Sequence, residues 1–208
     1  MSGETPAVPK RRDWLDIVAV FVLSVTAVLT AWCGFEASKW GGEMSIAFSQ
    51  ASSARIQAAS AEGEARTARQ FDLSVWAEWI GATYRGDTDL ADYIEARFST
   101  EFAIAFDAWE AGDRVEEGPF SMDEYVPPGT VEAQTLSATA DEKYQEALAN
   151  NQRGDNYSLL TVMFALVLFL TAMSQRELAP WARKVMLGGA VVVAVVGIAL
   201  LATFPIRL

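Results

Sequence analysis

The chain contains no histidine and only one cysteine in 208 residues. The lack of histidine removes the commonest general base, the commonest transition-metal ligand and the simplest switch at physiological pH. Cys33 alone cannot form a disulfide within the chain, so we interpret it as a small packing residue, with an intersubunit disulfide as the alternative. The sequence also lacks a phosphate-binding loop, a nucleophile elbow and a zinc-protease motif. These absences argue against an enzyme and predict no cofactor.

Charged side chains are also scarce in three long apolar runs, residues 14–35, 157–174 and 185–206. Each run is about as long as the ~20 residues that a helix needs to cross ~30 Å of hydrocarbon. No Asp, Glu, Lys or Arg lies deep within them, which disfavours a proton-coupled or ion-coupled transporter. The pattern predicts an all-α integral membrane protein with three transmembrane helices.

Basic residues flank these runs in two short segments, 1–13 and 175–184. They are Lys10, Arg11 and Arg12 in the first segment, and Arg176, Arg183 and Lys184 in the second. Because basic flanks face the cytoplasm, both segments are predicted to be cytoplasmic, which leaves 36–156 and the tail 207–208 outside. A cleaved signal peptide is disfavoured for the first run, which is long and has no A-x-A site after it.

The segment between the first two runs is acidic. Residues 36–155 contain 23 acidic and 9 basic side chains, a net charge of −14, and residues 87–124 alone have a net charge of −10. Such a surface repels nucleic acid and attracts cations or basic proteins, although solubility is the simpler explanation. The candidate patch for a cation or a basic partner consists of Asp113, Glu116, Glu117, Asp123 and Glu124.

A heptad pattern of alanine follows the first run. Its positions are Ala47, Ala51, Ala54, Ala58, Ala61, Ala65 and Ala68. The alternating steps of 4 and 3 predict a long helix, 43–84, whose small seam residues let a partner helix approach closely. A similar pattern in the segment 130–156 comprises Ala133, Ser137, Ala140, Tyr144, Ala147, Asn151 and Gly154. We expect an antiparallel stalk of two helices, joined to the first span at Gly41 and Gly42. Pairing of the seams between subunits is an alternative that does not exclude the stalk.

The segment 85–129 is rich in aromatic residues as well as acids. Two short helices, 89–98 and 100–111, are predicted within it, followed by a loop that contains Gly and Pro. We interpret the aromatic residues as the core of a small helical cap. The alternative is a cleft for an apolar or cationic ligand that uses ring faces and carboxylates together.

Small residues also form stripes within the spans. They are Ser24, Ala27, Ala31 and Gly34 in the first span, and Ala190, Ala194 and Gly197 in the third. Such stripes allow close packing of transmembrane helices, either within one chain or between subunits. Their spacing does not distinguish between these two uses.

Three stretches resemble uncharacterised three-span bacterial inner-membrane proteins with a long periplasmic helical domain. They are AWCGFEASKWGGEMSIAFSQASSAR (Ala31–Arg55), RFSTEFAIAFDAWEA (Arg97–Ala111) and GPFSMDEY (Gly118–Tyr125). The resemblance extends over nearly the whole chain. It implies a location in the bacterial inner membrane, with residues 36–156 in the periplasm, and it implies no activity.

Taken together, these patterns favour a non-enzymatic, self-associating membrane protein that is an envelope scaffold or a regulatory or accessory subunit. A multimeric cation channel with an acidic vestibule is the first alternative. A periplasmic ligand sensor that lacks its own output domain is the second, based on shape alone.

Overall fold

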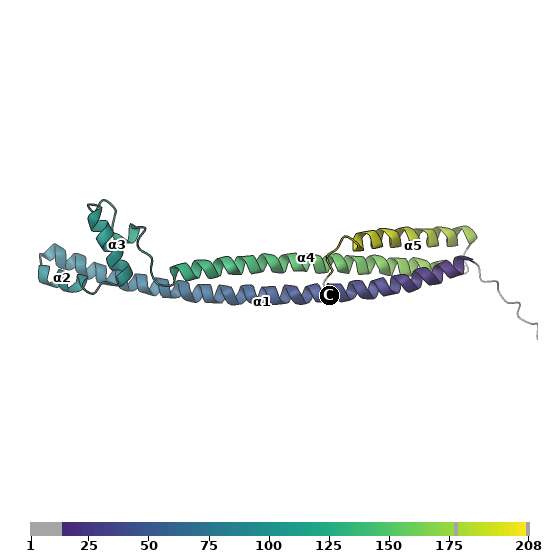
Figure 1. Ribbon diagram of the computed structural model, residues 1–208, viewed down its shortest axis with the longest axis horizontal. Coiled ribbons are helices and arrows are strands. Elements are labelled where there is room, and N and C mark those ends of the chain that lie inside the picture. The colour runs from purple at the N-terminus through teal and green to yellow at the C-terminus, as the bar shows by residue number, and fades with distance from the viewer. Residues whose placement is uncertain (1–13, 177–178, 207–208) are drawn as a thin grey trace, which may run out of the picture. The chain divides into compact units, whose positions relative to one another are not determined.

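The computed structural model describes residues 14–176 and 179–206, and these residues form helices and no strand (Figure 1). The elements are α1 (Trp14–Arg85), α2 (Thr88–Glu95), α3 (Thr100–Ala111), the 3₁₀ helix η1 (Pro119–Ser121), α4 (Thr130–Ser174) and α5 (Pro180–Leu201). The predicted cytoplasmic segment 1–13 and the tail 207–208 lie outside the described residues, as do residues 177–178 of the loop 175–184.

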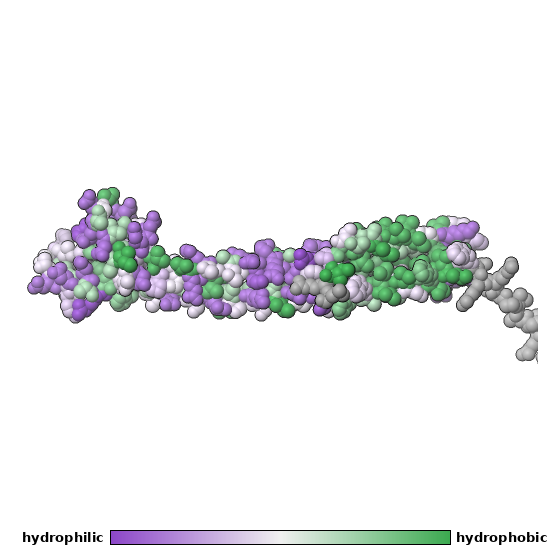
Figure 2. Space-filling model, viewed as in Figure 1, coloured by the Kyte–Doolittle hydropathy of each residue, from purple (hydrophilic) through white to green (hydrophobic). Residues whose placement is uncertain are grey.

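Three helices, α1, α4 and α5, are long and apolar enough to cross a membrane. The predicted all-α class, with three helices able to span a bilayer, is therefore confirmed. In Figure 2 the apolar surface gathers over α5 and the adjoining segments of α1 and α4.

The first span and the stalk segment that follows it belong to one unbroken helix, α1, of 72 residues. The chain is helical through Gly41 and Gly42, where we expect the span to join the stalk. Each glycine costs a helix up to about 1 kcal/mol. Trp40 and Ala47 on either side are both buried, and their packing offsets that cost.

The chain divides into two compact units. The described residues up to 46 and from 146 onward form the first, which we call the membrane unit, and residues 47–145 form the second, which we call the polar unit. The membrane unit extends beyond the predicted span boundaries at residues 35 and 157. The first turns after span one and the last turns before span two therefore pack with the spans.

The core of the membrane unit is an apolar cluster where α1, α4 and α5 meet. It contains Cys33 and Trp40 of α1 with Tyr157, Leu160 and Phe164 of α4. The Tyr157 hydroxyl donates a hydrogen bond to the carbonyl oxygen of Pro205, at 3.0 Å, which ties the end of α5 to α4. Asp16 and Arg183 form an ion pair elsewhere in this unit.

In the polar unit, α1 and the first part of α4 run antiparallel. Phe48 contacts Tyr144 with ring centroids 5.6 Å apart, and further along α1 Arg55 pairs with Asp141 at 2.7 Å. Because residue numbers rise on α1 as they fall on α4, the two segments form a hairpin. The segment that connects α1 to α4 ends at Gly129, which lies against the backbone of Ala61.

Two short helices lie between the arms of this hairpin in the sequence. Asp87 caps α2 by accepting a hydrogen bond from the amide of Leu90, and Ser99 caps α3 by accepting one from Phe102. Such side chains satisfy backbone amides that otherwise have no partner in the first turn of a helix. The α2 helix ends at Glu95, three residues before the predicted end at residue 98, and α3 has its predicted bounds.

Candidate functional site

Most of the predicted alanine seam of α1 is buried. The buried members are Ala47, Ala51, Ala54, Ala58 and Ala61, and Ala65 and Ala68 are half-buried. On α4, Ala140 and Ala147 are fully buried and Ala133 is half-buried. On α1 the protected alanines therefore follow the alternating steps of 4 and 3, whereas on α4 the protected alanines recur only at every seventh residue.

The other half of the α4 pattern is exposed to solvent. The structure places Ser137, Tyr144 and Asn151 on the exposed surface, and Asn150 is buried instead. The α4 helix therefore buries one set of its heptad positions within its own chain and leaves the other set available for contact with another helix.

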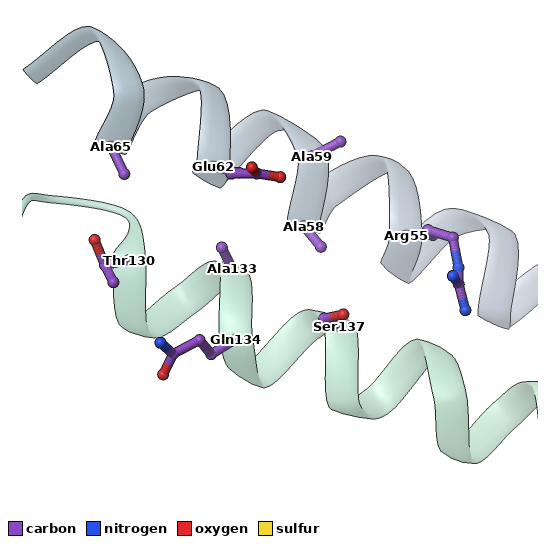
Figure 3. Close-up of a pocket in the computed structure, with 9 residues that line it drawn as sticks. All are labelled: Arg55, Ala58, Ala59, Glu62, Ala65, Thr130, Ala133, Gln134 and Ser137. Carbon is purple, nitrogen blue, oxygen red and sulfur yellow. The ribbon is translucent and has the colours of Figure 1, made fainter. Parts of the chain in front are cut away.

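This second stripe borders a groove in the polar unit (Figure 3). The cavity has a volume of about 430 Å³ and is lined by Arg55, Ala58, Ala59, Glu62 and Ala65 of α1 with Thr130, Ala133, Gln134 and Ser137 of α4. In Figure 3, Ala58 and Ala65 point toward α4, and Ala133 points back toward α1. The floor is thus made of methyl groups, and the rim carries polar and charged groups. We call this surface the alanine groove.

Two further cavities share lining residues with the alanine groove. One, of about 630 Å³, shares Arg55 and is also lined by Phe48 and Tyr144. The other, of about 350 Å³, shares Glu62, Ala65 and Thr130 and is also lined by Phe120 and Tyr125. The concave surface therefore continues along several turns of the hairpin, and its length suits a helix better than a small ligand.

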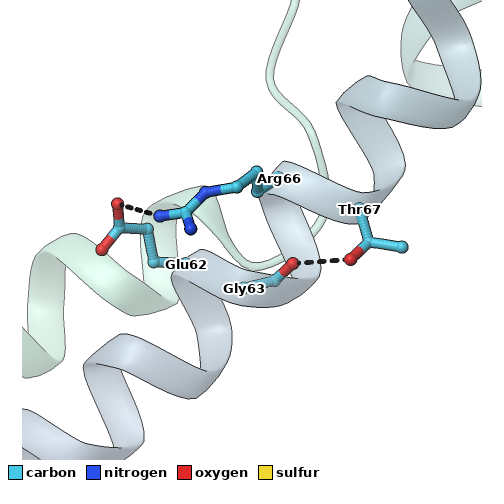
Figure 4. Close-up of polar contacts among 4 residues, drawn as sticks. All are labelled: Glu62, Gly63, Arg66 and Thr67. Atoms are coloured by element: carbon cyan, nitrogen blue, oxygen red, sulfur yellow. Dashed lines mark hydrogen bonds and ion pairs between the residues drawn. The ribbon is translucent and has the colours of Figure 1, made fainter.

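Charged side chains along the rim are paired and exposed. Arg55 pairs with Asp141 at 2.7 Å, and Arg66 pairs with Glu62 at 3.1 Å (Figure 4). Exposed pairs of this kind contribute about 0–1 kcal/mol, because water screens them and ordering the side chains costs entropy. Replacing these ion pairs with equivalent ion pairs to another molecule would therefore change the free energy little.

Replacing Gly63 with alanine is expected to stabilise the hairpin by about 0.5–1 kcal/mol, because alanine is the better helix former. Gly63 is helical, and a Cβ atom there would meet no atom within 4 Å. Its carbonyl oxygen accepts a hydrogen bond from the Thr67 hydroxyl at 2.9 Å, which the substitution leaves in place (Figure 4). Thermal unfolding of the nanodisc-held protein, followed by circular dichroism, measures the effect. A lower unfolding temperature would contradict the prediction and point to a neighbouring helix that needs the glycine.

The aromatic side chains of the predicted cap pack against one another. Trp76 stacks on Trp79 with ring centroids 4.9 Å apart, and Phe106 lies edge-on to Trp79 at 5.1 Å. Phe102 packs against Phe98 at 4.8 Å and is fully buried. These contacts join α3 to the end of α1 and make the cluster a core for this part of the polar unit.

A buried carboxylate lies beside this cluster, at a position that the sequence analysis did not single out. Asp72 continues the heptad pattern of α1, is 2% exposed, and accepts a hydrogen bond from the Tyr125 hydroxyl at 2.9 Å. Burial and then this hydrogen bond raise the pKa of Tyr125 well above its usual value. The contact fastens the loop after η1 to α1. The sequence could have indicated this site, because an acidic residue stands at the heptad position where alanine would continue the seam.

The residues of the predicted cation or basic-partner patch all lie on the exposed surface: Asp113, Glu116, Glu117, Asp123 and Glu124. Asp113 and Arg114 have φ angles of 57° and 56°, which form a tight turn after α3. Across residues 14–176 and 179–206, no group of three or more His, Cys, Asp or Glu side chains is placed to hold a metal ion.

The small-residue stripes of the spans have different environments. Ala190 and Gly197 are buried and Ala194 is half-buried, whereas Ser24, Ala27, Ala31 and Gly34 are exposed. A Cβ atom at Gly197 would lie 2.7 Å from the Phe164 ring, so α5 needs this glycine to approach α4. The third-span stripe therefore packs within the chain, and the first-span stripe faces outward.

Glu36 is a second acidic residue that the sequence analysis did not single out. It is the first residue of the predicted periplasmic segment, belongs to the membrane unit and is 0% exposed. It lies close enough to Cys33 and Tyr157 to act on both electrostatically. Burying a carboxylate at the edge of an apolar core costs free energy unless a partner group compensates its charge. Glu36 is therefore a sensitive point of the helix interface.

No protein-family model, curated protein or solved structure matches this chain.

Proposed function

We propose that this protein is a non-enzymatic membrane scaffold or accessory subunit that assembles with copies of itself through the alanine groove. The observation that carries this proposal is the split pattern of α4. Ala140 and Ala147 are buried within the chain, while Ser137 lines the alanine groove and Tyr144 lines the adjoining cavity. A methyl-lined groove gives little hydrophobic energy per residue, but it allows a helix to approach at the short end of the ~8–10 Å range.

A second copy of this chain suits the groove because copies inserted in one membrane have their equivalent residues aligned. Copies inserted in the same direction have parallel α1 helices, so equivalent residues lie at the same height. Arg55 and Asp141 are already level, since they pair at 2.7 Å within one chain. Arg55 of one copy is therefore level with Asp141 of the next, and the pair can form across the interface.

We further infer that the polar unit is a periplasmic hairpin with an aromatic cap, held in a bacterial inner membrane with the N-terminus in the cytoplasm. The positions of Lys10, Arg11, Arg12, Arg183 and Lys184 support this orientation. The net charge of −14 over residues 36–155 also suits a solvated domain away from anionic head groups.

Cysteine cross-linking in native membranes tests the assembly directly. In a Cys33→Ala background, which has no other cysteine, Ala59→Cys places a thiol at the alanine groove, and Ser60→Cys places one on exposed surface that does not line it. A short bismaleimide is expected to link copies that carry Ala59→Cys and to leave those with Ser60→Cys mainly monomeric. Similar monomer fractions in both variants would contradict self-assembly through this groove.

A further inference from the structure

A second kind of cavity in the polar unit lies between α2 and α3 and shares no residue with the alanine groove. It has a volume of about 290 Å³ and is lined by Asp92, Glu95, Ala96, Phe98, Ala103, Phe106 and Asp107. We call it the cap groove. It has room for a side chain rather than for a drug-sized ligand, which typically needs about 300–1,000 Å³.

The ring of Phe98 forms the apolar part of the cap groove that a ligand can reach, because Phe98 is only half-buried. Phe106 is 1% exposed, with its ring centroid 5.2 Å from that of Phe98, and it supports this ring as part of the core. The face of an aromatic ring carries partial negative charge and attracts ammonium and guanidinium groups. The ring also offers apolar contact to the methylene stem of a long basic side chain.

Three carboxylates, those of Asp92, Glu95 and Asp107, border the same cavity and are exposed. Among the residues that the structure describes, none of the three has an ion-pair partner within 4.0 Å. Glu95 accepts one hydrogen bond, from the indole nitrogen of Trp79 at 3.3 Å. The negative charge of the cap groove is therefore not balanced by a direct ion pair.

The two arginines of the acidic stretch 87–124 are engaged with other groups. The Arg97 guanidinium lies 3.4 Å above the Tyr93 ring and donates a hydrogen bond to the Tyr93 carbonyl oxygen. Arg114 pairs with Glu110 and lies over the Trp109 ring at 5.1 Å. Neither arginine lines the cap groove.

We propose that the cap groove docks a basic segment of a partner protein, with one lysine or arginine side chain seated against Phe98 among the three carboxylates. Charge complementarity selects this occupant. A hydrated metal ion gains little from an aromatic ring, whereas a lysine or arginine side chain contacts the Phe98 ring and the carboxylates together. The net charge of −10 over residues 87–124 extends beyond the groove and attracts further basic residues of the same segment. Docking does not depend on self-assembly, because both helices belong to one chain.

The test uses the full-length protein in phosphatidylcholine nanodiscs and fluorescein-labelled tetralysine amide as the probe, with binding followed by fluorescence anisotropy at low salt. The groove variant is Asp92→Asn/Glu95→Gln/Asp107→Asn. The matched control, Asp113→Asn/Glu116→Gln/Glu117→Gln, removes the same charge from the exposed turn that follows α3 and does not line the groove. We expect saturable binding to the wild type, about tenfold weaker binding to the groove variant, and less than about threefold weakening in the control.

Equal weakening in the two triple variants would show diffuse attraction to the acidic surface and would overturn the proposal. Absence of saturable binding to the wild type would overturn it as well. The replaced side chains are exposed, and glutamine at position 95 keeps an oxygen that can accept the hydrogen bond from Trp79. The single variant Asp107→Asn provides a second measurement, with about threefold weaker binding expected. Unchanged binding in this variant would also count against the proposal.

Discussion

Replacing Phe106 with alanine is expected to lower the free energy of unfolding of the aromatic cap, residues 85–129, by about 3–5 kcal/mol. Phe106 is 1% exposed, and its ring contacts Trp79 at 5.1 Å, Phe98 at 5.2 Å and Trp76 at 6.0 Å between centroids. Truncation removes these contacts and leaves a cavity that rigid neighbouring rings fill poorly. The loss is expected to be local to the cap, since the hairpin contacts are made by other residues.

Hydrogen–deuterium exchange of residues 88–121, with a urea titration followed by tryptophan fluorescence, measures this loss. The matched control is Tyr84→Ala, which removes an aromatic ring that is 94% exposed. Its expected effect is within about 0.5 kcal/mol, as for most surface substitutions. Comparable losses of protection in the two variants would mean that the aromatic cluster is not the core of the cap.

Replacing Gly129 with alanine is expected to destabilise the hairpin by about 2–4 kcal/mol, through two separate effects. Gly129 has a φ angle of +83°, which is costly for any residue with a Cβ atom. In addition, that Cβ would lie 2.4 Å from the carbonyl oxygen of Ala61, a backbone atom that cannot move alone. The turn must therefore shift away from α1.

Gly86→Ala separates the two effects. Gly86 also has a positive φ angle, +74°, but a Cβ atom there would meet nothing within 4 Å. It is expected to cost only the conformational term, about 1–2 kcal/mol. Thermal unfolding of both variants, followed by circular dichroism, gives the comparison. Equal effects would contradict the close approach of the turn to Ala61.

The Gly129 result also bears on the proposed assembly. The alanine groove requires Ala58 of α1 and Ala133 of α4 to stay close together, and the turn at Gly129 is the nearest connection between these two arms. If the turn shifts, cross-linking through Ala59→Cys should fall in the Gly129→Ala background. The same cross-linking should persist with Phe106→Ala, whose effect is confined to the cap.

Local patterns were sufficient for the long helices. The heptad spacing from Ala47 to Ala61 predicted a continuous helix with one protected stripe, and the structure buries these residues. Apolar run length likewise predicted three helices able to span a membrane. Both inferences depend on residues within one segment, because helical periodicity and span length are local properties.

The sequence by itself therefore determined the all-α class, the three apolar segments and the acidic character of residues 36–155. Only the tertiary structure decided which stripe of each helix meets a partner: Gly197 is packed against Phe164 while Gly34 is exposed, and Ala140 is buried while Ser137 borders a groove. It also decided that Asp72 and Glu36 are buried. The physical reason is that these outcomes depend on the rotation and register of helices far apart in the chain. Spacing within one helix defines its faces, and the neighbouring helices select which face is covered.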